Sequence, residues 1–112
     1  MSEANLLGAC LAKPAGLSEL VKYSEDSIVS KTVIDKPVGT ITLFAFDKGQ
    51  KLSEHTAPYD AVIQVIDGNG IINIDGKANA VSEDQIIIMP ANIPHSVSAE
   101  EKFKMMLIMI RE

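Results

Sequence analysis

The chain has little of what nucleic-acid-binding or membrane-spanning proteins need. Its 112 residues include 15 acidic and 10 basic side chains, so the net charge is −5 at pH 7, and the lysines form no cluster. A nucleic-acid-binding domain usually carries a basic patch, so we expect no nucleic-acid partner. No apolar run approaches the roughly 20 residues needed to cross a bilayer, and we expect no membrane association.

Cysteine and basic N-terminal residues are also scarce. The single cysteine, Cys10, cannot form an internal disulfide, which favours a reducing compartment. Its neighbours include no base that would activate it, so we interpret it as a small apolar side chain. No basic residue precedes the apolar stretch at 6–12, unlike a secretory signal. We therefore expect a cytoplasmic protein.

The length and composition predict one globular domain. A chain of 112 residues with 46% hydrophobic side chains can bury a single core but not two. We expect residues 1–30 to form a lead-in with a short helix at 18–23, capped by Ser18, and a strand able to exchange between subunits. Residues 31–112 would then form the main body of the fold.

From residue 27 onward the pattern is one of short strands. Segments rich in isoleucine, valine and threonine alternate with turns such as Asp75-Gly76, and no long helical periodicity appears after residue 23. This spacing is typical of an all-β sandwich or barrel. The predicted strands are 27–34, 40–46, 62–66, 71–74, 86–89, 96–98 and 103–110.

Two of these strands are apolar on both faces. Neither set of alternate residues is polar in 86–89 or in 105–110. A strand with one face in water would alternate, so both faces here need cover. We therefore expect a homodimer, formed through the outer face of a sheet or by exchange of an N-terminal strand.

The two histidines stand in separate motifs. In the first, Gly49 is followed after five residues by His55, and Gly68 closes the motif; in the second, Pro90-Ala91-Asn92 precedes His95. Taken in order, these motifs resemble those of the cupin superfamily over roughly residues 38–110, and especially small single-domain bacterial cupins. The resemblance implies a double-stranded β-helix, or jelly-roll barrel, with a ligand site at the barrel mouth and frequent dimerisation.

The resemblance also implies that His55 and His95 are metal ligands. However, the second histidine of the first motif is replaced by Ala57, and its glutamate by Ala61. Catalytic metal sites usually have three protein ligands. Three readings remain. The two histidines hold one divalent ion (zinc, nickel, manganese or iron) together with water or ligand, they hydrogen-bond a ligand or water without metal, or they simply pack in the core.

Four other side chains are candidates for the site. We expect Tyr59 and Gln64 to contact the ligand, beside His55 and His95. Asp60 and Glu54 could supply the missing metal ligand or an acid–base group. Strand alternation points both away from the site unless a bulge turns them inward.

The sequence thus predicts a small-molecule-binding cupin that takes a polar or anionic ligand at the barrel mouth. The alternative is a metal-dependent isomerase, lyase or dioxygenase acting on a small organic acid or a sugar derivative. A third hypothesis is an interaction module without a working site. The sequence identifies neither the ligand nor a catalytic residue.

Overall fold

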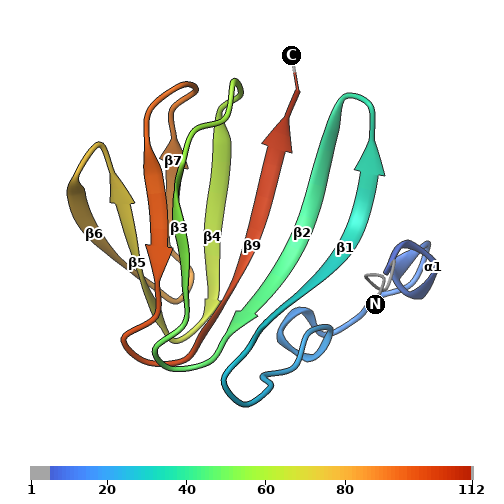
Figure 1. Ribbon diagram of the computed structural model, residues 1–112. Coiled ribbons are helices and arrows are strands. Elements are labelled where there is room, and N and C mark those ends of the chain that lie inside the picture. The colour runs from blue at the N-terminus through green and yellow to red at the C-terminus, as the bar shows by residue number, and fades with distance from the viewer. Residues whose placement is uncertain (1–5, 112) are drawn as a thin grey trace.

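The chain folds into two antiparallel β-sheets that face each other, as the computed structural model in Figure 1 shows. It describes residues 6–111. One sheet has five strands in the order β1-β2-β9-β4-β7, and the other has four in the order β3-β8-β5-β6. The strands are β1 (Ile28–Lys36), β2 (Gly39–Phe46), β3 (Lys51–His55), β4 (Ala61–Asp67), β5 (Asn69–Ile74), β6 (Lys77–Ser82), β7 (Ile86–Met89), β8 (His95–Ser98) and β9 (Phe103–Ile110).

The predicted all-β class is therefore confirmed, and every predicted strand is present. Two strands were missed, β3 and β6, and both form edges of the four-stranded sheet. Their sequences are polar or small, with exposed residues along most of their length, so they lack the β-branched pattern on which the prediction relied.

Among residues 6–111, helix is confined to two short turns before β1. These are α1 (Leu7–Cys10) and a 3₁₀ helix (Leu17–Glu19). The helix predicted at 18–23 is thus wrong in extent, and Ser18 does not cap it, because the cap position is Gly16. Within residues 6–111, no helix has the length and apolar character required to cross a membrane.

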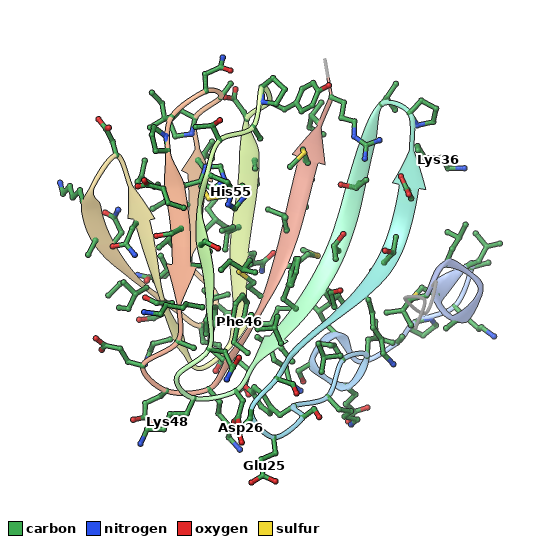
Figure 2. All side chains as sticks on the ribbon, viewed as in Figure 1. Glu25, Asp26, Lys36, Phe46, Lys48 and His55 are labelled. Atoms are coloured by element: carbon green, nitrogen blue, oxygen red, sulfur yellow. The ribbon has the colours of Figure 1, made fainter. Side chains whose placement is uncertain are left out.

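The main core fills the space between the two sheets. Phe46 and Phe103 are fully buried and stack with ring centroids 4.8 Å apart; Phe46 lies in the lower half of the molecule in Figure 2. Gly70 of the opposite sheet leaves room for the Phe103 ring, since a Cβ there would lie 2.4 Å from its Cε2. The aromatic pair therefore fixes the spacing of the sheets at this end.

A second, smaller core lies on the outer face of the five-stranded sheet. Here the segment before β1 packs Leu6 and Val21 against Leu43 and Ala45 of β2. The segment before β1 therefore covers part of the outer face of its own sheet. Exchange of a strand between subunits remains a prediction.

Polar contacts anchor the same segment. The Tyr23 hydroxyl donates to Asp67 Oδ2 at 2.6 Å, and the buried Lys104 donates to the Ser18 carbonyl. Burial and the Asp67 carboxylate raise the pKa of Tyr23 above its ordinary range, so the phenol stays protonated and keeps donating. Residues 17–23 are thereby fixed across β4 and β9.

Candidate functional site

A β-bulge brings the two histidines onto the same face of the four-stranded sheet. Leu52 pairs with Val97, and His55 pairs with His95. Between these two pairs β3 spans three residues but β8 spans only two, so β3 carries one extra residue. In a regular ladder Glu54 would stand opposite His95. The bulge places His55 there instead, which reverses the alternation of β3 after Leu52.

The loops beside the two histidines are tied together. Asn92 N–H donates to the Ala57 carbonyl at 2.7 Å, and Ala91 N–H donates to Asp60 Oδ1 at 2.8 Å. Asn92 has a positive φ of 67°, which allows the tight turn before Pro94. The loop 56–60 therefore holds the loop 90–94 in place, and each loop fixes the position of one imidazole.

Each imidazole is oriented by a carbonyl two residues before it. His55 Nδ1 lies 2.8 Å from the Ser53 carbonyl oxygen, and His95 Nδ1 lies 3.1 Å from that of Ile93. A carbonyl oxygen only accepts hydrogen bonds, so each Nδ1 carries the proton and donates it. Both neutral rings then present an unprotonated Nε2.

These two Nε2 atoms face each other at 3.2 Å, with the rings nearly perpendicular at 73°. In Figure 2, His55 projects into the space between the sheets in the upper half of the molecule. Two lone pairs at this distance repel unless a proton or a cation lies near both. Nitrogens each about 2.1 Å from one zinc ion, at bond angles of about 90–110°, would be about 3.0–3.4 Å apart. The pair thus fits two neighbouring ligands of one metal ion.

The rest of a four-ligand metal site is absent from the described residues. No group of three or more histidine, cysteine, aspartate or glutamate side chains comes together within residues 6–111. Ala61, at the position of the family glutamate, is buried and pairs with Met89 and Met109. An ion held by the two imidazoles would keep its full positive charge and open coordination positions.

The structure does not bring the other candidates to this pair. Gln64 pairs with Met106 and Ile86, on the face of β4 opposite to the buried Ala61, Ile63 and Val65. Because alternate residues of a strand point to opposite faces, Gln64 lies outside the barrel, and the predicted inward orientation is wrong. Among the described residues, no hydrogen bond or ring contact joins the half-buried Tyr59 to either imidazole.

The two acidic candidates, Asp60 and Glu54, also lack a hydrogen bond to either imidazole. Asp60 accepts the hydrogen bond from Ala91 N–H and so positions the loops. Glu54 is exposed beside the bulge. The groups that sequence reasoning missed are the carbonyls of Ser53 and Ile93, because main-chain acceptors leave no signal in a side-chain motif.

Burial should make the stability of the metal-free protein depend on pH. His95 is 5% exposed, and its burial, followed by the nearby charge of His55, lowers its pKa below the ordinary value. In the unfolded chain the same imidazole takes up a proton near pH 6.5. As the pH falls through that value the unfolded state binds more protons than the folded state, so the free energy of unfolding falls.

We therefore expect urea unfolding of chelator-treated protein to show lower stability at pH 5.5 than at pH 7.5. The variant His95→Gln should lose much of this dependence. If the free energy of unfolding changed equally with pH in the parent and in the variant between pH 5.5 and 7.5, the role given to His95 would be contradicted.

Two facing antiparallel sheets with this strand order form a double-stranded β-helix, and the mouth of this barrel carries a histidine pair. Proteins of this class place their ligands within the barrel. The cupin-domain family matches residues 42–111. The chain belongs to the cupin family, as its two motifs indicated.

Solved structures support this assignment. A conserved protein of unknown function from Streptococcus pyogenes is 36% identical over 100% of this chain and 96% of its own, with a TM-score of 0.89. A cupin 2 conserved barrel domain protein from Leptotrichia buccalis is 46% identical over 84% of this chain, with a TM-score of 0.82. The match spans only 46% of that longer chain. No curated relative matches this chain.

Proposed function

We propose that the barrel mouth binds a small anionic molecule, such as a carboxylate, through a divalent cation held by His55 and His95. The proposal rests on one observation: two Nε2 atoms 3.2 Å apart, each made an acceptor by a carbonyl at its Nδ1. Such a pair favours a shared cation. Neutral ligands leave the charge of the ion uncompensated, which favours an anion at its open positions.

The surroundings of the pair support a binding site more than a catalytic one. When bound, a divalent ion supplies a Lewis acid that attracts and polarises an oxygen of the ligand. The chain supplies the two imidazoles and the apolar wall around Ala61, Met89 and Met109. Within residues 6–111, the hydrogen bonds of the two imidazoles go to main-chain carbonyls and to each other, and no carboxylate joins them in a cluster of three. The enzyme alternative therefore has no acid–base group hydrogen-bonded to the pair.

Thermal unfolding of chelator-treated protein tests the proposal. A ligand that binds only the folded state raises its melting temperature by mass action. We expect zinc or nickel to raise it, and small dicarboxylates to raise it further only when the metal is present. The corresponding uncharged diamides serve as controls. Equal stabilisation by the dicarboxylates without metal, or in His55→Ala, would overturn binding through the cation.

A further inference from the structure

Two methionines flank Ala61 on the inner face of the five-stranded sheet. Ala61 pairs with Met89 of β7 on one side and with Met109 of β9 on the other, so the three side chains form one row across the sheet. Met89 is buried, and Met109 packs against the core between the sheets. The small side chain of Ala61 therefore lies between two long, flexible thioethers. These three residues are called the methionine row below.

The methionine row lies at the same end of the barrel as the histidine pair. β7 ends at Met89 and β8 begins at His95, while β3 ends at His55 and β4 begins at Ala61. Each crossing between the sheets spans five residues, and the two crossing loops are hydrogen-bonded to each other. Ile74, which pairs with His95, packs against the core cluster that contains Ala61 and Met89. The thioethers and the imidazoles thus come from facing sheets at one end of the space between them.

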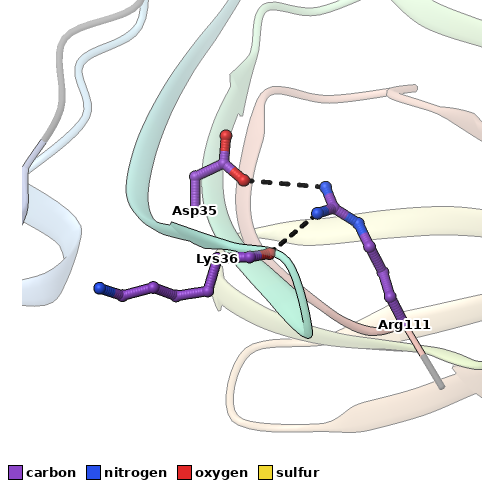
Figure 3. A network of polar contacts seen from close by, with 3 residues as sticks. All are labelled: Asp35, Lys36 and Arg111. Atoms are coloured by element: carbon purple, nitrogen blue, oxygen red, sulfur yellow. Dashed lines mark hydrogen bonds and ion pairs between the residues drawn. The ribbon is translucent and has the colours of Figure 1, made fainter.

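The same level of the sheet also holds a carboxylate, and Arg111 pairs with it. The pairing continues from the methionine row across β2 to Asp35 on the edge strand β1, three strands away from Ala61. Figure 3 shows Arg111 with Nη2 3.8 Å from Asp35 Oδ1, while Nη1 donates to the Lys36 carbonyl at 2.9 Å. The donor atoms that flank Ala61 are therefore neutral sulfurs, and the carboxylate of this level is held at the sheet edge.

Neutral sulfur and nitrogen donors suit a soft ion with a single charge. Thioether sulfur is a soft ligand typical of Cu(I), and imidazole also binds copper, whereas zinc sites take their sulfur from cysteine thiolate. A single charge costs much less to bury than a double charge, since the solvation energy of an ion rises with the square of its charge. His95 and Met89 are both buried. The side of the histidine pair that faces the methionine row therefore favours Cu(I).

We propose that His55 and His95, with at least one of the thioethers of Met89 and Met109, form a Cu(I) site. This site rests on the histidine pair of the proposed function, and Cu(I) competes there with the divalent ion. Methionine has three rotatable side-chain bonds, so its sulfur can turn toward an ion between the imidazoles without a change in the backbone. Zinc needs the imidazoles alone, whereas Cu(I) also needs sulfur. The two metals therefore separate the roles of the two kinds of side chain.

Competition against a chromophoric Cu(I) chelator, in oxygen-free buffer with ascorbate, tests this site. Every protein carries Cys10→Ser, because a free thiol binds Cu(I) by itself. The double variant Met89→Leu/Met109→Leu conserves volume and should lower the Cu(I) affinity by at least about 10-fold, with the zinc affinity unchanged. Met106→Leu is the matched control, because Met106 packs in the second core on the outer face of the same sheet. Circular dichroism of each variant checks that it has folded.

X-ray absorption at the copper edge should show sulfur beside nitrogen in the Cys10→Ser protein, and no sulfur in the double variant. Unchanged Cu(I) affinity in the double variant, with both metals lost in His55→Ala, would overturn the thioether site and leave the histidine pair in place. Equal losses of zinc and Cu(I) in the double variant would indicate a disturbed pair and would also overturn the thioether site. Zinc and Cu(I) affinities that both survive His55→Ala would overturn the proposed function together with this site.

Discussion

Replacing His55 with alanine should lower the affinity for zinc by at least about 100-fold, because even an outer partner of a metal ligand is commonly worth 10–100-fold. The variant leaves one imidazole, which cannot hold the ion between two nitrogens. His55 is exposed, so its loss should change the stability of the metal-free protein by no more than about 0.5 kcal/mol. Affinity and folding are therefore separable at this position.

Competition against a chromophoric chelator measures the affinity, and urea unfolding measures the stability. Glu54→Ala is the matched control, because Glu54 is exposed and adjacent but lies outside the histidine pair. His95→Ala should lose the metal as well, but it should also destabilise the fold, since His95 is buried. Unchanged zinc affinity in His55→Ala would remove the basis for the proposed site.

Replacing Gly70 with alanine should destabilise the fold by about 1–3 kcal/mol, the usual cost of overpacking a core. The added methyl would lie 2.4 Å and 2.5 Å from two atoms of the Phe103 ring. That ring is fully buried and stacked on Phe46, so it cannot move aside without disturbing the aromatic pair. The clash should therefore force a change in the distance between the two sheets at this point.

Gly8→Ala is the control for this substitution. Gly8 lies in α1, where a Cβ would meet no atom within 4 Å. Alanine also favours helix over glycine by about 0.5–1 kcal/mol, so this variant should be neutral or slightly stabilised. Denaturant midpoints compare the two variants directly. A Gly70→Ala protein as stable as the parent would show that the aromatic pair tolerates displacement.

The strands rich in isoleucine, valine and methionine could be predicted from the sequence, because strands buried on one or both faces have an apolar composition. The prediction missed β3 and β6, whose polar residues resemble loops. The cupin motifs identified the fold, and they named the two histidines that the structure brings together at the candidate site. What they could not identify was how those side chains would be oriented.

Orientation depends on register, which the sequence leaves open. Gln64 looked like a ligand contact because it is the one amide in an apolar strand, yet the pairing with Met106 puts it outside the barrel. Conversely, β3 contains no glycine or proline before His55 that would have predicted the bulge from the sequence. A shift of one residue reverses the face of every side chain that follows, so small irregularities decide which candidates meet.

The most direct test of the histidine pair is a long-range ¹H–¹⁵N spectrum of the imidazole nitrogens, recorded without metal and with one equivalent of zinc. The chain has only two histidines, so every ring signal belongs to the site. We expect both rings to be Nδ1–H tautomers in the metal-free protein above pH 7, and both Nε2 signals to move together when zinc is added. An Nε2–H tautomer on either ring, or zinc that binds without moving both signals, would contradict the account.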